Sequence, residues 1–207
     1  MSKLSGFKLL IFLACLGPLA YLLWALLQDA LGANPIEELS RRSGEWTLRF
    51  LLLTLAMTPL QKLLQQPWPL RLRRMLGLYT FFYASLHLLT YLWLDQFFVW
   101  SEIVADILQR PFILVGLLAF LLLLPLALTS NRASQRWLGR RWKRLHRLVY
   151  IIAALGIVHF FWLVKKDLLM PSIYLIILVI LLGARLGIAW HRHRQGRARV
   201  LASATSK

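Results

Sequence analysis

Long apolar stretches without charged side chains dominate the pattern of this chain. Five of them hold 17 to 21 residues each: 9–27, 75–94, 111–131, 148–164 and 168–184. A helix needs about 20 apolar residues to cross the hydrocarbon core of a membrane, and about 17 is the lower limit. Because backbone N–H and C=O groups in lipid must be paired within their own segment, each stretch predicts a transmembrane helix.

A sixth span is the least apolar of the set. Residues 50–61 form an uncharged run of only 12 residues, so a full-length span at 47–64 has to include Arg49 and Lys62. Such long basic side chains can reach toward the membrane surface. The first stretch, preceded by Lys3 and Lys8, has a signal peptide as its alternative, but its length favours a retained helix. We therefore predict an all-α integral membrane protein with a six-transmembrane-helix bundle, at about 9–27, 47–64, 75–94, 111–129, 148–164 and 170–190.

Charged residues separate between the connecting loops. The chain has 25 Lys and Arg against 8 Asp and Glu, a net charge of +17. All eight acids lie in the first, third and fifth loops, whereas the second and fourth loops and both tails contain only cations. Because Lys- and Arg-rich loops stay in the cytoplasm, the N- and C-termini are predicted to be cytoplasmic. The basic charge indicates topology and anionic membrane lipid rather than nucleic acid, since no recognition motif accompanies it.

Composition narrows the class further. Hydrophobic residues make up 59% of the chain and charged residues 16%. This composition argues against a soluble domain, which needs a more polar surface. The single cysteine, Cys15, excludes an internal disulfide. Glycine-rich nucleotide-binding motifs are absent from the sequence. Residues 1–190 are thus expected to form one transmembrane domain, and residues 191–207 a basic, disordered cytoplasmic tail.

Two histidines lie at the same depth in different predicted spans. Counted from the cytoplasmic ends near residues 75 and 148, His87 lies about 18 Å and His159 about 16–17 Å into the membrane. An ionisable residue inside a membrane is costly and usually functional. Two facing imidazoles at one level make an axial pair for a haem iron, and Ala84 and Gly156, one turn away, leave room for it. The alternatives are a hydrogen-bonded packing role or, less favoured, a proton path in a transporter.

A third histidine, His146, lies at the inner interface, about 20 Å from His159 along the helix. Thirteen residues turn an ideal helix about 140° short of a whole number of turns, so the two do not share a face. Arg73 and Arg74 are level with His146, where a second haem would want another histidine. Three readings stay open: an oddly ligated second haem, an anionic cofactor such as a flavin phosphate held by the arginines, or arginines that only anchor the helix. His191 and His193 in the tail are read as solvated.

Several long motifs resemble the MsrQ (YedZ) family of bacterial membrane proteins. They are RRMLGLYTFFYASLHLLTY, LTSNRASQRWLGRRWKRLHRLVYIIAALGIVHFFW, TPLQ and RPFILVG. The resemblance covers nearly the whole chain and implies a ferric-reductase-like transmembrane domain in the bacterial inner membrane. It also implies b-type haem, one or two groups, and FMN. Carried over by motif, His87 and His159 match the family's paired haem ligands, His146 its third histidine, and Arg73 and Arg74 its arginine pair.

The resemblance further implies an electron-transfer subunit of an oxidoreductase system. Electrons would come from the quinone pool or a cytoplasmic flavin reductase. They would go to MsrP, a periplasmic molybdopterin enzyme that reduces methionine sulfoxide in oxidised proteins and carries out the catalysis. The chain departs from larger oxidases of this fold, since it lacks their second histidine on the third span and their cytoplasmic flavin and nicotinamide domain. A cytochrome b-type anchor for another redox partner is the alternative. The number of haems, the flavin position, the donor, the ligand opposite His146 and the oligomeric state stay open.

Overall fold

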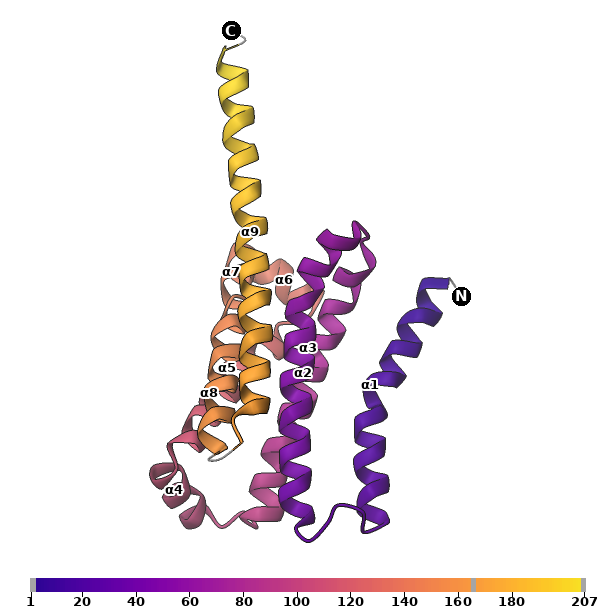
Figure 1. The fold of residues 1–207 in the computed structure, drawn as a ribbon, viewed down its shortest axis with the longest axis vertical. Helices are drawn as coiled ribbons and strands as arrows, with labels where there is room; N and C mark the ends of the chain where they lie inside the picture. The colour runs from indigo at the N-terminus through magenta and orange to yellow at the C-terminus, as the bar shows by residue number, and fades with distance from the viewer. Residues whose placement is uncertain (1–2, 165–166, 206–207) are drawn as a thin grey trace.

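Helices make up the chain over the residues that the computed structural model describes, 3–164 and 167–205 (Figure 1). They are α1 (Lys3–Leu27), α2 (Pro35–Leu64), α3 (Trp68–Leu89), the π-helix η1 (Thr90–Asp95), α4 (Trp100–Gln109), α5 (Pro111–Leu128), α6 (Arg132–Leu138), α7 (Arg140–Leu145), α8 (Leu148–Leu163) and α9 (Leu169–Thr205). The prediction of an all-α fold is confirmed. The short helices α4, α6 and α7 lie where the sequence predicted only loops.

Five helical segments are long and apolar enough to cross a membrane. They are Gly6–Leu27, Trp68–Asp95, Pro111–Leu128, Arg140–Leu163 and Leu169–His191. They coincide with the five long apolar stretches of the sequence, and the chain is a multi-pass membrane protein. The segment predicted as the second span lies in α2, which has 30 residues but is less apolar than the other five.

Helix α2 begins at Pro35, twelve residues before the predicted span. Asn34 caps it, since its side chain accepts a hydrogen bond from the Glu37 backbone N–H at 3.3 Å, and Pro35 has no N–H that would need a partner. The acidic side chains of Glu37 and Glu38 in the first turn stabilise the helix, because they lie at the positive end of its dipole. The polar segment before residue 47 is therefore helix, and α2 is about 45 Å long.

The connections gather at two ends of the bundle (Figure 1). One end holds the N-terminal end of α1, the α2–α3 connection, α6 and α7, and α9 extends beyond them; this is called the basic end. The opposite end, called the acidic end, holds the α1–α2 connection, α4, the C-terminal end of α8 and the N-terminal end of α9. The predicted acid-containing loops are those at the acidic end, so the charge separation in the sequence is also a separation in space.

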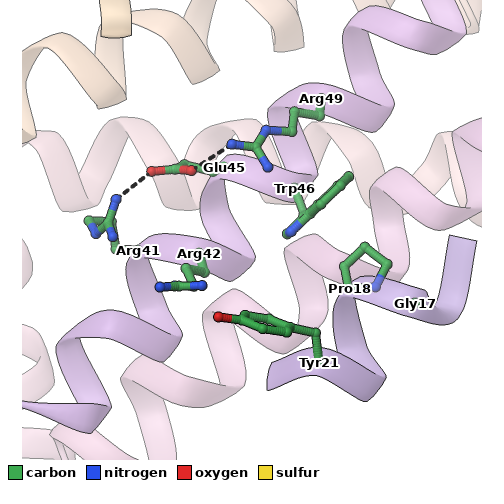
Figure 2. Close-up of a pocket in the computed structure, with 8 residues that line it drawn as sticks. All are labelled: Gly17, Pro18, Tyr21, Arg41, Arg42, Glu45, Trp46 and Arg49. Carbon is green, nitrogen blue, oxygen red and sulfur yellow. Dashed lines mark hydrogen bonds and ion pairs between the residues drawn. The ribbon is translucent and has the colours of Figure 1, made fainter. Parts of the chain in front are cut away.

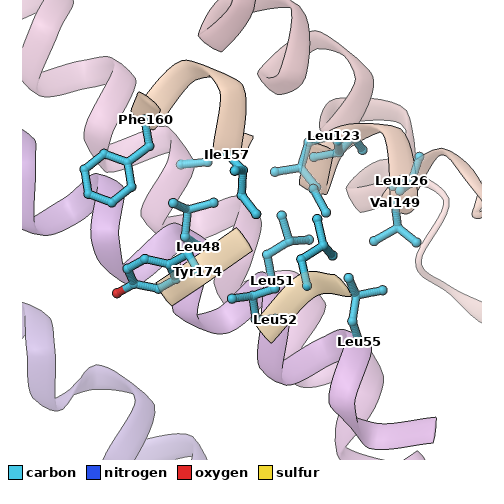
Figure 3. Close-up of a cluster of buried hydrophobic side chains, with 14 residues drawn as sticks. Leu48, Leu51, Leu52, Leu55, Leu123, Leu126, Val149, Ile157, Phe160 and Tyr174 are labelled. Atoms are coloured by element: carbon cyan, nitrogen blue, oxygen red, sulfur yellow. The ribbon is translucent and has the colours of Figure 1, made fainter. Parts of the chain in front are cut away.

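Two apolar clusters hold the helices together. The larger, in Figure 3, joins α2 to α5, α8 and α9 through buried side chains such as Leu51, Leu123, Ile157 and Tyr174. The smaller joins α2 and α3 to α1, with stacked rings of Phe50 and Tyr83 whose centroids are 5.2 Å apart. Helix α2 contributes to both clusters and therefore lies at the centre of the bundle.

Helix α1 is attached to α3 by two tyrosine hydroxyls. Tyr79 donates to the carbonyl of Phe12 at 2.8 Å. Tyr83 donates to the carbonyl of Cys15 at 2.8 Å and accepts from the N–H of Leu19 at 3.1 Å. The Cys15 carbonyl and the Leu19 N–H are the two groups that would pair with each other in an undisturbed helix. Together with Pro18, which lacks an N–H, this contact accounts for the bend of α1 in Figure 1.

Helix α9 continues to Thr205, whereas the sequence pattern predicted no regular structure after residue 190. Residues 191–205 contain no proline and are rich in Arg and Ala, which favour helix. The side chains of His191 and Gln195, one turn apart, are in hydrogen-bond contact at 3.0 Å, and the Arg194 guanidinium lies 5.3 Å from the Trp190 ring. Extending an existing helix costs less than starting a new one, so the transmembrane part of α9 continues into these residues.

Candidate functional site

His87 and His159 face each other inside the bundle. His87 lies in the last turn of α3 and His159 lies in α8. Their ring centroids are 6.1 Å apart, and the ring planes make an angle of 77°. The structure thus brings together the two histidines that the depth argument placed at one level.

Each ring is oriented by a backbone carbonyl on a neighbouring helix. Nδ1 of His87 lies 2.8 Å from the carbonyl oxygen of Ser40 in α2, and Nδ1 of His159 lies 2.6 Å from that of Phe112 in α5. A carbonyl can only accept, so both Nδ1 atoms carry the proton and donate it. Each Nε2 is left with a free lone pair, the form in which a neutral imidazole binds a metal ion.

The spacing of the rings fits a shared metal ion. Imidazole nitrogens bind metal ions at about 2 Å. Two such bonds in line, plus roughly 1 Å from each nitrogen to its ring centre, put the centroids about 6 Å apart, which agrees with the observed 6.1 Å. Among the described residues, no cluster of three or more His, Cys, Asp or Glu could hold a bare metal ion. A haem iron fits this pair, because the porphyrin supplies the other four ligands.

Two glycines make the space for the histidines. A Cβ atom added at Gly116 of α5 would lie 2.8 Å from Nδ1 of His159, and one added at Gly44 of α2 would lie 3.2 Å from Nδ1 of His87. Sequence reasoning named Ala84 and Gly156 for this role instead. A Cβ atom added at Gly156 would lie 3.0 Å from the Leu48 side chain, so this glycine serves helix packing. Gly116 ends the RPFILVG motif, but neither it nor Gly44 was linked to the histidines, because both are far from them in sequence.

A cavity of about 290 Å³ at the basic end brings the three other predicted site residues together. Arg73 and Arg74 of α3 and His146, which caps α7, all line it. The polar side chains around them are Thr54, Thr80, Ser130, Asn131, Arg132, Gln135 and Trp142. Among the described residues, every ion pair lies elsewhere, in α2 or between Arg110 and Asp106, so the arginines of this cavity have no carboxylate partner. Its uncompensated positive charge favours an anionic occupant.

His146 has one ring nitrogen without a partner. Nδ1 donates to the carbonyl of Trp142 at 3.2 Å, and the indole stacks on the imidazole with centroids 3.9 Å apart. Nε2 is buried and, within the described part of the chain, has no hydrogen-bond partner. It therefore has the lone pair and tautomer of a metal ligand. No other His, Cys or Met is among the described residues that line the cavity.

Trp142 and Arg132 were not among the predicted site residues. The Trp142 indole N–H donates to the carbonyl of Thr129 at 3.0 Å, which fixes the ring that stacks on His146. Its spacing of four residues from His146 was a detectable signal, since residues four apart lie on one face of a helix. The side chain of His191 is exposed at the end of the segment Leu169–His191, and the side chain of His193 lies outside the described residues.

The chain also matches a known family of membrane proteins. Residues 43–157 match the family described as "Ferric reductase like transmembrane component". This range contains His87, His146 and the arginine pair, and it ends two residues before His159.

The chain is also similar to proteins named "Protein-methionine-sulfoxide reductase heme-binding subunit MsrQ". The relative from Azospira oryzae is 57% identical over 185 residues, which cover 88% of this chain and 79% of the relative. The relative from Herminiimonas arsenicoxydans is 50% identical over 199 residues, covering 95% and 91%. That from Xanthomonas euvesicatoria is 52% identical over 184 residues, covering 86% and 84%. The chain therefore belongs to the MsrQ family of ferric-reductase-like transmembrane proteins.

Proposed function

We propose that this protein is the haem-binding membrane subunit that carries electrons to a methionine sulfoxide reductase. The observation that carries the proposal is the pair of facing imidazoles, with both Nδ1 atoms on carbonyls and a centroid separation of 6.1 Å. The names of the relatives, which describe a haem-binding subunit of protein-methionine-sulfoxide reductase, support the same function.

The haem is of b type, held by His87 and His159 as axial ligands. Bound there, it would supply a one-electron carrier inside the membrane. His87 and His159 each keep Nε2 free, because both Nδ1 atoms donate to carbonyls. The part of the protein is to keep both imidazoles neutral, to fix their tautomers and to hold the rings apart at ligand spacing.

The bundle crosses the bacterial inner membrane six times, with α2 as the second span and both termini in the cytoplasm. The apolar clusters support this topology because they place α2 at the centre, in contact with α3, α8 and α9. The cation-rich connections, which lie at one end, support the orientation through the preference of Lys and Arg for the cytoplasmic side. The basic end then faces the cytoplasm and the acidic end the periplasm.

The cavity at the basic end takes FMN or a second haem. Its volume, about 290 Å³, is at the lower end for small-molecule sites, so the two cofactors are alternatives for one space. The unpaired Arg73 and Arg74 favour a phosphate, which guanidinium groups bind through two parallel hydrogen bonds. The free Nε2 of His146 favours a haem with one protein ligand. The charge of the cavity makes FMN the better supported of the two.

The partners follow from the two ends of the bundle. Electrons enter from the quinone pool or from a cytoplasmic flavin reductase near the basic end. The periplasmic enzyme MsrP accepts them at the acidic end, which is near His87 because the carbonyl of Ser40, early in α2, contacts that ring. MsrP carries out the methionine sulfoxide reduction.

Visible spectra of the purified protein, oxidised and dithionite-reduced, test the haem assignment. The wild type should show a sharp reduced α-band and one haem per chain at the His87–His159 site. His87→Ala and His159→Ala should each lose that band, while His191→Ala, on the exposed part of α9, should keep it. Full haem content in both His87→Ala and His159→Ala would refute the ligand assignment.

Flavin content tests the cavity at the basic end. Arg73→Gln and Arg74→Gln should lower the FMN retained per protein, with the main haem band unchanged. Arg71→Gln is the matched control, since it is an exposed arginine on the same turn that does not line the cavity. Equal flavin loss in all three variants would mean that general basic charge, and not this cavity, holds the cofactor.

Reconstitution with purified MsrP tests the partner. The reduced protein should be reoxidised when MsrP and a methionine sulfoxide substrate are both present, and not with substrate alone. Failure of this transfer, with intact haem, would favour a cytochrome b-type anchor for another redox partner.

A further inference from the structure

A second pocket, of about 450 Å³, lies between α1 and α2 on the side toward the acidic end. Figure 2 shows it between Gly17, Pro18 and Tyr21 of α1 and a charged face of α2 formed by Arg41, Arg42, Glu45, Trp46 and Arg49. It is called the outer pocket below. None of its residues takes part in the sites proposed above.

Positive charge exceeds negative charge around the outer pocket. Glu45 is bridged by Arg41 at 2.7 Å and Arg49 at 2.9 Å, as the dashed lines in Figure 2 show. Glu38, just outside the pocket, pairs with Arg41 and with Nε of Arg42. The three guanidinium groups therefore face two carboxylates. Arg42 contacts Glu38 through Nε, and its guanidinium lies 5.3 Å from the centroid of the Tyr21 ring, inside the pocket.

The outer pocket lies at the level where a membrane changes from hydrocarbon to headgroups. Nε of Arg49 donates to the Tyr174 hydroxyl at 2.9 Å, and Tyr174 is five residues, about 7.5 Å, inside the span that begins at Leu169. Arg42 precedes Arg49 by seven residues, so it lies about 10 Å nearer the acidic end. The pocket therefore extends from the edge of the apolar layer to the depth of the lipid phosphates.

An open space beside α1 adjoins this charged face. No atom lies within 4 Å of the position that a Cβ of Gly17 would occupy. Few side chains of α1 are buried, and Tyr21 and Trp24 are 47% and 56% exposed. In a bilayer, an open apolar space at this depth is filled by lipid chains.

We propose that the outer pocket binds an anionic phospholipid, with the phosphate on Arg42 and Arg49 and one acyl chain beside Gly17. Guanidinium groups bind phosphate oxygens through paired hydrogen bonds, and Trp46 and Tyr21 suit the interface between headgroups and hydrocarbon. An anionic headgroup is favoured over a zwitterionic one. The only carboxylate in the pocket, Glu45, is already neutralised by two arginines and has no free charge for an ammonium group.

Native mass spectrometry of the gently solubilised wild type is the first test. Phosphatidylglycerol should be retained above its share of the membrane, and neutral lipids should not. Thermal unfolding in detergent is the second test, with phosphatidylglycerol, phosphatidylcholine or inorganic phosphate added. Of the three additives, only phosphatidylglycerol should raise the unfolding temperature. For Arg42→Gln, roughly tenfold or more phosphatidylglycerol should be needed for the same rise, because the loss of a hydrogen bond to a charged group lowers binding affinity by at least about tenfold.

Arg110→Gln is the matched control, since Arg110 is a partly exposed arginine at the same end, paired with Asp106 at 2.9 Å. Gly17→Leu fills the space for the acyl chain without changing any charge, and it should weaken the lipid effect even if Arg42→Gln fails to fold. An equal shift with phosphatidylcholine would refute anionic selectivity. A full shift with inorganic phosphate alone would assign the pocket to a soluble phosphate. Retention of no lipid by the wild type, or unchanged responses of both variants, would refute the site.

Discussion

Replacement of Gly116 by alanine tests how closely the bundle holds the histidine pair. The added Cβ would lie 2.8 Å from Nδ1 and 2.9 Å from Cε1 of His159. Carbon atoms in comfortable contact are about 3.5 Å apart, so the ring has to move by roughly 0.6–0.7 Å. That movement also disturbs the 2.6 Å hydrogen bond from Nδ1 to Phe112.

The expected cost is of the size seen for overpacked interiors, about 1–3 kcal/mol. If the cost falls on the ligand position, haem affinity drops by roughly ten- to a hundredfold, since each 1.4 kcal/mol is a factor of ten. The assay is haem per protein by the reduced pyridine spectrum, followed by the rate at which the haem is lost to an excess of a haem-scavenging protein. Thermal unfolding of the haem-free protein separates a ligand effect from a loss of fold.

Two further glycine variants allow haem loss to be ranked against the closeness of the added Cβ. Gly44→Ala places its Cβ 3.2 Å from the His87 ring, so that ring needs to yield by only a few tenths of an ångström. Gly183→Ala, in α9, meets nothing within 4 Å and should be neutral. Haem loss should therefore be greatest for Gly116→Ala, smaller for Gly44→Ala and absent for Gly183→Ala. Full haem affinity in Gly116→Ala would refute the close contact with His159.

Three other predictions concern residues outside this pair. His146→Ala should keep the main haem band and lose the cofactor of the cavity at the basic end, measured as flavin or second haem per protein; an unchanged count of both would exclude His146 from that site. Hydrogen bonds from Arg41 hold the pKa of Glu38 below its usual value of 4.5, so the ion pair stabilises the fold above about pH 4.5 and is lost as the pH falls further. The unfolding temperature of Glu38→Gln should thus be lower than that of wild type at pH 7 and approach it below pH 4.5, and a constant difference across this range would contradict the assignment. Tyr83→Phe should lower the free energy of unfolding by about 1 kcal/mol, measured by denaturation in detergent, and no change would mean that its hydroxyl does not hold α1.

The sequence predicted the parts of this fold that repeat along the chain. Apolar length located the five long spans, and equal depth indicated that His87 and His159 meet, because both arguments depend only on the regular rise of a helix. Arg73, Arg74 and His146 were expected at one level for the same reason, and they do line one cavity.

Contacts between distant segments were beyond sequence reasoning. The carbonyls of Ser40 and Phe112 are each 47 residues from the histidine that they orient, and a backbone carbonyl is common to every residue, so nothing in the sequence marks these two. The helical continuation after residue 190 was missed because composition alone cannot tell a charged tail from a charged helix that extends a preceding one. The early start of α2 was missed because its ion pairs were read as loop charges, although their spacing of three and four residues is typical of a helix.

The tyrosine contact with α1 has a consequence for how the protein is made. The Tyr83 hydroxyl bonds to Leu19, which leaves the ribosome 64 residues earlier. At roughly 5–20 residues per second, α1 waits about 3–13 s in the translocation site for that hydroxyl. During this interval the backbone groups of Cys15 and Leu19 lack the hydroxyl that contacts both of them in the folded protein. The native contacts of α1 are therefore completed only after α3 has been made.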